Sequence, residues 1–227
     1  MVKSLKSVAK ELIPPILIRV LRSVPRYFHT SYQRAEPWGW RPKEWYDNVF
    51  ESYGHYRKHY SESVYHFIWT VVADRILRSG ASSVLDLGCG PGQFASLLRD
   101  MGLKRYCGVD FSAKAINLAR QQCPSFEFHV VDLSESDLLK TFDYDCVVAL
   151  EFLEHVRDDD IIIAQIRSGT KFYATVPSFP DVAHVRHFLD QEEVRRRYQG
   201  HFSSFRVDVF IMNPKGTSLY LMEGTKL

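Results

Sequence analysis

The sequence predicts an α/β protein with a mostly parallel, seven-stranded sheet that has helices on both faces. From about residue 73 of the 227-residue chain, short β-branched or apolar runs alternate with helical stretches, a pattern typical of parallel strands joined by crossover helices. The last two strand-like runs are joined by Asn-Pro-Lys-Gly at residues 213–216. That hairpin signal predicts an antiparallel end to the sheet.

The expected elements follow one another in a regular order. The predicted strands are Ser82 to Leu87, Tyr106 to Val109, Phe126 to Val131, Tyr144 to Leu150, Lys171 to Val176, Phe205 to Met212 and Ser218 to Met222. The predicted helices begin near Gln93, Ala113, Ser136, Asp159 and Gln191. Because 45% of the residues are hydrophobic, a chain of this length can bury one substantial core. We therefore expect one catalytic domain, over residues 73–227.

Two smaller regions precede that domain. Residues 1–34 carry seven Lys or Arg residues against one acidic residue, Glu11, and form a basic amphipathic segment that suits either an anionic membrane surface or packing on its own domain. Residues 35–72 form an N-terminal helical region that holds all four tryptophans. This region is predicted to be an aromatic lid over a substrate pocket, helical packing against the flank of the sheet, or both.

Charge and cysteine usage limit the function classes. Beyond residue 34 the chain has 22 basic and 26 acidic residues, so its charge gives no support to DNA or RNA as a partner. The four cysteines have no zinc spacing and are expected to be reduced core thiols. No apolar run approaches the ~20 residues that span a bilayer, and no signal peptide is evident. We expect a cytoplasmic protein whose residues 1–34 can contact the inner face of the membrane.

The strongest motif is the glycine-rich run from Val84 to Phe94, which reads Val-Leu-Asp-Leu-Gly-Cys-Gly-Pro-Gly-Gln-Phe. Glycines are needed where the backbone turns tightly and approaches a ligand closely. The dinucleotide fingerprint Gly-x-Gly-x-x-Gly is not met, because Gln93 occupies its third glycine position. Asp86 precedes the glycines, which disfavours a polyanion and suits a ligand with an ammonium and a sulfonium group. The glycines of the loop are Gly88, Gly90 and Gly92.

Acidic residues also follow the next two predicted strands. Asp110 is placed to accept both hydroxyls of a ribose, Phe111 to lie on an adenine ring, and Asp132 to meet the adenine amino group. Any single Asp could instead be a helix cap or turn residue, and an NAD enzyme is the main rival. The predicted cofactor-binding residues are Asp86, Gly88, Cys89, Gly90, Gly92, Asp110, Phe111, Asp132, Leu133 and Glu151.

Together these motifs resemble the nucleoside-binding motifs of class I S-adenosylmethionine methyltransferases, over roughly residues 50 to 222. The resemblance implies a Rossmann-like class I methyltransferase fold with S-adenosylmethionine as the cofactor. Methyl transfer is an in-line displacement at an activated carbon, so the protein mainly aligns and desolvates the acceptor. A hydroxyl acceptor must also lose its proton.

Candidates for that proton transfer follow the fourth strand in Ala-Leu-Glu-Phe-Leu-Glu-His-Val. Glu151, Glu154 and His155 have the spacing that would place them on one face of a helix starting there. His155 is predicted to be the general base, with Glu154 to orient it. Beyond the fifth strand, His184 and His187 lie in a loop expected at the carboxyl ends of the strands. The predicted catalytic residues are His155, Glu154 and His187.

The same Glu-x-x-Glu-His string is similar to one in ubiquinone-pathway O-methyltransferases and in small-RNA 2′-O-methyltransferases, where it resembles a divalent-metal site. Two carboxylates and an imidazole suit a hard ion such as Mg²⁺ or Mn²⁺, with His184 or His187 as a further ligand. Many relatives carry the string without a metal. In them the two glutamates favour a helix N-terminus and contact the methionine end of the cofactor. The sequence leaves the metal unknown.

The segment Val176 to Tyr198 resembles the corresponding region of small-molecule and glycan-associated methyltransferases, and it lacks the basic surface of an RNA reader. We therefore expect O-methylation of a hydroxyl on a small molecule or a saccharide, as in polysaccharide biosynthesis, or on a lipid-linked precursor. Two alternatives stay open: a metal-dependent RNA 2′-O-methyltransferase, and a cofactor-binding partner subunit without catalysis. Relatives that share a fold and cofactor can act on unrelated acceptors.

Overall fold

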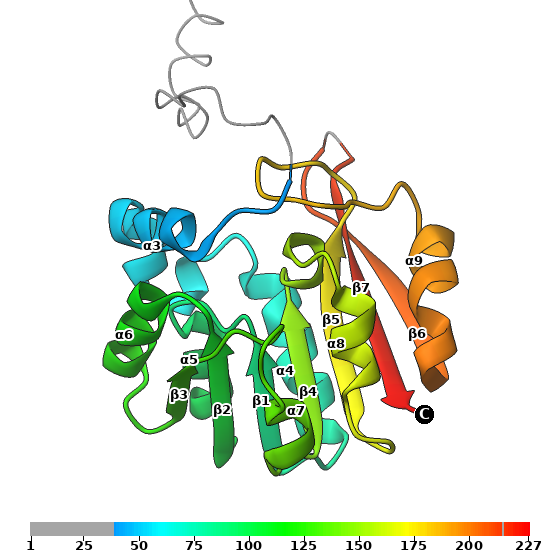
Figure 1. Cartoon of the computed structure of the whole chain (residues 1–227), viewed down its shortest axis with the longest axis horizontal. Helices are drawn as coiled ribbons and strands as arrows, with labels where there is room; N and C mark the ends of the chain where they lie inside the picture. The colour runs from blue at the N-terminus through cyan, green and yellow to red at the C-terminus, as the bar shows by residue number, and fades with distance from the viewer. Residues whose placement is uncertain (1–38, 215) are drawn as a thin grey trace, which may run out of the picture. The chain divides into compact units, whose positions relative to one another are not determined.

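The computed structural model describes residues 39–214 and 216–227. Their seven-stranded sheet has the order β3-β2-β1-β4-β5-β7-β6, with helices on both faces (Figure 1). The first five strands run parallel, and β7 runs antiparallel to both β5 and β6. These findings confirm the predicted mostly parallel sheet with an antiparallel C-terminal hairpin. The predicted basic segment, residues 1–34, lies outside the described residues.

Each predicted strand and helix after residue 73 corresponds to an observed element. The strands are β1 (Ser83–Leu87), β2 (Arg105–Asp110), β3 (Glu127–Val130), β4 (Cys146–Leu150), β5 (Lys171–Pro177), β6 (Phe202–Ile211) and β7 (Ser218–Lys226). The α-helices are α3 (Lys43–Ser52), α4 (His66–Arg78), α5 (Gln93–Asp100), α6 (Ala113–Gln122), α7 (Leu138–Thr141), α8 (Asp159–Ala164) and α9 (Gln191–Tyr198). The 3₁₀ turns are η1 (Gly54–Arg57), η2 (Tyr60–Glu62), η3 (Leu153–His155) and η4 (Gln199–His201).

Two hydrophobic clusters, one on each face of the sheet, form the core. Side chains alternate between faces along a strand, so Val84 of β1 packs with α4, α5 and α6, while Leu85 packs with α7, α8 and α9. All five residues of β1 are buried, as expected for a central parallel strand covered on both sides. The carboxyl ends of β1, β2, β4 and β5 carry the candidate site.

Of the two roles predicted for the aromatic region, the structure shows packing against the sheet, and a lid over a substrate pocket stays a prediction. Helix α4 packs against the sheet through Ile68, Val72 and Ile76, which are almost completely buried. Helix α3 lies beyond the carboxyl ends of the parallel strands (Figure 1). Because α4 continues to Arg78, the predicted boundary at residue 72 falls inside a helix. No helix within the described ranges is long and apolar enough to cross a membrane.

Candidate functional site

The glycine loop after β1 is held in a backbone conformation that favours glycine. Gly88, Gly90 and Gly92 have φ values of 71°, 52° and 81°, in the left-handed region where a Cβ is unfavourable. A Cβ on Gly88 would lie 2.4 Å from Cδ2 of Phe152, and one on Gly92 would lie 3.0 Å from Cα of Ala119. Tight packing therefore adds to the conformational requirement at both ends of the loop.

Asp110, at the end of β2, connects this loop to the start of α6. Its Oδ2 accepts a hydrogen bond from the amide of Gly90 (3.1 Å), and its Oδ1 accepts one from the amide of Ser112 (2.8 Å). Burial raises the pKa of Asp110 to about 6, and these two amide donors oppose the shift. The carboxylate thus fixes the loop while lying where a ribose would bind in an open α/β sheet.

The other predicted cofactor residues divide into three environments. Asp86 is buried and accepts a hydrogen bond from the Tyr106 hydroxyl (2.5 Å), and burial raises its pKa to about 7. Cys89 and Leu133 are buried in the two core clusters. Asp132 is exposed, and its Oδ1 accepts hydrogen bonds from the amide and hydroxyl of Ser134. Asp132 therefore stabilises its own turn in this structure.

No helix starts at Glu151, which was the condition for Glu151, Glu154 and His155 to share one helical face. Strand β4 ends at Leu150, and Glu151 has a φ of 52°, the one positive value recorded for a non-glycine residue in the described part of the chain. Its amide donates to Oγ1 of Thr175 (2.9 Å), and the short turn η3 follows. The shared helical face is therefore absent, because a left-handed residue interrupts the continuous helical turns that an i, i+3, i+4 face requires. Such strain often marks a functional site.

The structure nevertheless brings Glu154 and His155 together with His184. A carboxylate oxygen and one nitrogen from each ring all lie within 4.8 Å of one another. Nδ1 of His155 lies 3.0 Å from the carbonyl oxygen of Ala183, and Nδ1 of His184 lies 3.1 Å from that of Phe179. A carbonyl only accepts, so each Nδ1 carries the proton and each Nε2 is left with a free lone pair.

Burial determines the charge state of this cluster. It raises the pKa of Glu151 to about 7 and that of Glu154 well above its ordinary value, with repulsion by Glu151 adding to the effect on Glu154. Burial, with His184 beside it, lowers the pKa of His155 to about 4. His155 is therefore neutral at pH 7, which suits a metal ligand better than a general base, whose best pKa is near the working pH.

Several buried polar atoms in this cluster have no hydrogen-bond partner. Both carboxylate oxygens of Glu154, Oε1 of Glu151 and the hydroxyl of Tyr46 are in this state. Buried polar groups are satisfied in most folded proteins, and a group left unpaired in a low-dielectric site is costly. The atoms around Glu154 are thus arranged for a ligand or an ion. These atoms could hold the reacting end of a cofactor, an acceptor or a cation.

Tyr46 of α3 is a site residue that the sequence analysis did not single out. Its ring meets the ring of Phe111 edge-on (centroids 5.2 Å apart) and that of His155 edge-on (5.8 Å). It therefore lies between the predicted adenine contact and the carboxylate cluster. The density of aromatic residues in residues 35–72 was the available signal, but it could not indicate which ring reaches the site.

The loop after β5 contributes differently from the sequence prediction. Arg186 donates from Nη1 to the carbonyl oxygens of Leu153 and Val156, and pairs with the fully buried Asp159 (3.1 Å). It thus anchors the η3 turn that carries Glu154. His187 is exposed and lines an open hollow with residues of α8 and α9. The structure therefore brings His184, and not His187, to Glu154 and His155.

The raised pKa of Glu151 predicts a pH-dependent effect on stability. Because the folded carboxyl keeps its proton up to about pH 7, whereas its ordinary value is 4.5, Glu151 makes the protein less stable as the pH rises from about 4.5 to 7. We expect Glu151→Gln to raise the free energy of unfolding at pH 8 by about 1–3 kcal/mol, and to change it little at pH 4.5. Urea unfolding at both pH values measures this, and an equal gain at both would contradict it.

A seven-stranded sheet of this order, with a left-handed glycine loop after β1 and an acidic residue at the end of β2, defines the class I S-adenosylmethionine methyltransferase fold. The chain belongs to the family described as "Methyltransferase domain", whose model matches residues 53–209. This membership supports the predicted cofactor class over the NAD alternative.

Curated relatives match over part of the chain. This chain is 32% identical over 85 residues to the ubiquinone biosynthesis O-methyltransferase of Thiobacillus denitrificans, and the match covers 36% of each chain. It is 44% identical over 62 residues to the trans-aconitate 2-methyltransferase of Paracidovorax citrulli, covering 26% of this chain and 24% of the relative. The match to these two relatives spans less than half of their length.

Solved structures share the fold at low sequence identity. Magnesium protoporphyrin IX methyltransferase from Synechocystis PCC 6803, with S-adenosylhomocysteine (SAH) bound, superposes with a TM-score of 0.59 at 17% identity, covering 82% of this chain and 99% of that one. The N-terminal domain of EvdMO1, in the presence of SAH and D-fucose, has a TM-score of 0.54 at 14% identity, covering 68% and 82%.

Proposed function

We propose that this protein is an S-adenosylmethionine-dependent methyltransferase that methylates a hydroxyl group of a small molecule or a saccharide. The observation that carries the proposal is the hydrogen bond from the Gly90 amide to Asp110. It joins a loop of left-handed glycines to a carboxylate at the end of the neighbouring strand, where open α/β sheets bind nucleosides. Membership of the methyltransferase family supports the same cofactor.

The aromatic side chains around the cluster support this class of acceptor. Tyr46 meets both Phe111 and His155, so an acceptor beside the carboxylates would contact aromatic rings. Such rings offer a large apolar face with a polar handle, which suits both sugars and phenols. One relative reported above is named a ubiquinone biosynthesis O-methyltransferase, and the structure of the EvdMO1 N-terminal domain was solved in the presence of D-fucose. The proposed partner is thus a small molecule or saccharide, not DNA or RNA.

The residues near Glu154 also fit a divalent cation. Both carboxylate oxygens of Glu154 are without a hydrogen-bond partner, and one of them lies within 4.8 Å of one ring nitrogen of His155 and one of His184. Glu151 offers a further carboxyl group. We propose that these residues hold such an ion. When bound, it would polarise the acceptor oxygen and ease loss of its proton. Two imidazoles favour a transition ion such as Mn²⁺ over Mg²⁺, which prefers oxygen ligands and water.

Without an ion, the same residues orient and desolvate the acceptor. Glu154 and Glu151 are the nearby carboxyl groups, and His155 presents a neutral Nε2 that can accept a hydroxyl proton. Arg186 keeps the backbone of η3 in place through its carbonyl contacts. A cytoplasmic location, with residues 1–34 as a membrane contact, remains part of the proposal.

The direct test supplies the purified protein with methyl-labelled S-adenosylmethionine and separate extracts of small molecules, lipids, glycans, RNA and protein. We expect label in the small-molecule, lipid or glycan fraction. Label in RNA would replace the proposed acceptor with a nucleic acid, and cofactor binding without label in any fraction would indicate a non-catalytic subunit. Treatment with a chelator followed by Mn²⁺ or Mg²⁺ tests the ion: unchanged turnover after chelation would remove it from the proposal.

A further inference from the structure

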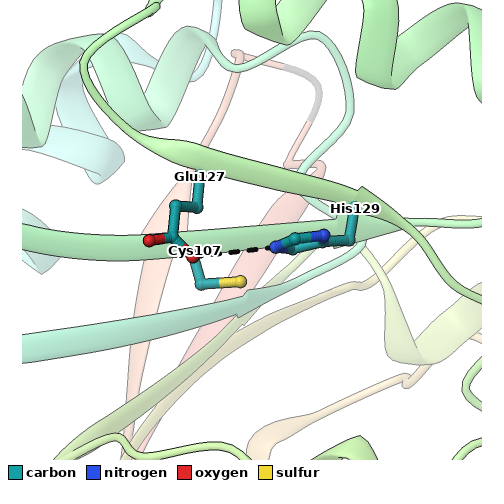
Figure 2. Close-up of side chains that lie close together, drawn as sticks. All are labelled: Cys107, Glu127 and His129. Carbon is teal, nitrogen blue, oxygen red and sulfur yellow. Dashed lines mark ion pairs between the residues drawn. The ribbon is translucent and has the colours of Figure 1, made fainter.

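A second group of metal-ligand atoms lies on the sheet, away from the cofactor loop. Cys107 of β2 pairs in register with Glu127 of β3, and Val109 pairs with His129. Because side chains alternate along a strand, Cys107, Glu127 and His129 project from the same face. Figure 2 shows the thiol, the carboxylate and the imidazole converging there. One ligand atom from each residue lies within 4.8 Å of the other two.

The surroundings of these residues differ from one to the next. Cys107 is 1% exposed and belongs to the core cluster on the α7–α9 face. Strand β3 is at the edge of the sheet, and the side chains of Glu127 and His129 are 71% and 50% exposed. A rigid thiol thus lies at the base of the group, with two adjustable side chains open to solvent above it.

Packing and the exposed ion pair do not account for this arrangement. Phe128, between the two polar residues, packs into the core cluster on the opposite face of the sheet. This packing explains why Glu127 and His129 project from the other face, but not why they are a glutamate and a histidine. Nε2 of His129 and Oε2 of Glu127 are 3.7 Å apart, and an exposed pair of this kind contributes little stability. Charged residues do protect edge strands, but that role does not require a thiol between them.

We propose that Cys107, Glu127 and His129 bind a borderline-soft divalent cation such as Zn²⁺. Cysteine sulfur, histidine nitrogen and carboxylate oxygen are the three ligand types of protein zinc sites, with bonds of about 2.0–2.3 Å. A thiolate selects against Mg²⁺ and Ca²⁺, which prefer oxygen ligands. On binding, the thiol releases its proton to solvent, and a water molecule on the open side completes the coordination.

This ion would link the edge strand β3 to the strand that ends at Asp110. Cys107 is three residues before Asp110 on β2, and the backbone amide of Val131, just after β3, donates to the carbonyl oxygen of Asp110 (2.9 Å). A bond across the two strands at Cys107 therefore restrains the segment that presents the proposed ribose contact. The inference does not depend on the proposed methyl transfer.

Titration of the full chain with Co²⁺, followed by near-ultraviolet absorption, tests the site. A thiolate bound to Co²⁺ gives a charge-transfer band, whereas the cluster of Glu154, His155 and His184 has no thiol and gives none. We expect a band whose final intensity corresponds to one thiolate-bound Co²⁺ per chain and which is displaced by Zn²⁺. Cys107→Ser should abolish it, and Cys123→Ser, a matched change at a buried cysteine on the other face, should leave it intact.

His129→Gln provides a variant at an exposed position, where misfolding is not a concern. We expect it to weaken Co²⁺ binding at least tenfold and to reduce the rise in melting temperature that Zn²⁺ produces in the unmodified protein. The absence of a charge-transfer band in the unmodified protein would overturn the proposal. So would a band that persists in Cys107→Ser, or an affinity that is unchanged in His129→Gln.

Discussion

Replacing His155 with glutamine is expected to lower kcat by about 10²- to 10⁴-fold while the dissociation constant for S-adenosylmethionine changes less than about threefold. His155 is neutral and has a ring nitrogen within 4.8 Å of a Glu154 carboxylate oxygen and of a His184 ring nitrogen. Glutamine offers neither an equivalent proton acceptor nor an equivalent metal ligand at that position. Steady-state kinetics on the labelled acceptor, with calorimetry for the cofactor, separate the two quantities.

His187→Gln is the matched control for that experiment. His187 is exposed and lies with residues of α8 and α9 rather than with Glu154, so we expect its kcat to stay within about threefold of the unmodified protein. A large loss in His187→Gln together with normal turnover in His155→Gln would reverse the assignment. Circular dichroism and a melting curve for each variant exclude loss of fold as the cause.

Replacing Asp110 with alanine is expected to weaken S-adenosylmethionine binding about 100-fold. Asp110 accepts hydrogen bonds from the amides of Gly90 and Ser112, and a hydrogen bond to a charged group contributes about 1.5–3 kcal/mol. Losing the proposed contacts to both ribose hydroxyls, and the restraint on the loop, should therefore cost about 3 kcal/mol of binding free energy, since 1.4 kcal/mol corresponds to tenfold in affinity.

Two further variants give the Asp110 experiment its specificity. Asp110→Asn keeps one acceptor oxygen, so its affinity should lie between that of Asp110→Ala and that of the unmodified protein. Asp132→Asn should change the affinity less than about tenfold, because Asp132 is exposed and stabilises its own turn. An unchanged affinity in Asp110→Ala would show that the cofactor does not use the end of β2.

The regular part of the fold could be predicted because local pattern determines it. The runs that became β1 to β5 are short and apolar, and the segments between them have helical periodicity; the two patterns alternate without interruption. The glycine loop was also predictable, since a left-handed backbone next to close packing leaves few alternatives to glycine. At Gly88 and Gly92 that requirement is visible in the structure.

The candidate active site was only partly predictable. Glu154 and His155 were identified by their string, but the left-handed conformation of Glu151, which excludes one continuous helix through the string, could not be read from it. The choice between His184 and His187 depended on how the loop after β5 folds back, which no local pattern fixes. Tyr46 reaches the site from α3, more than 100 residues earlier in the chain.

The sequence by itself therefore determined the order of strands and helices along the chain, the position of the cofactor loop and the family of the protein. Only the tertiary structure decided which side chains meet: His184 with Glu154 and His155, Tyr46 with Phe111, and Cys107 with Glu127 and His129. The physical reason is the distance along the chain over which each interaction acts. Strand and helix periodicity and glycine conformation are properties of neighbouring residues, whereas burial, pKa and ligand geometry arise when distant segments pack together.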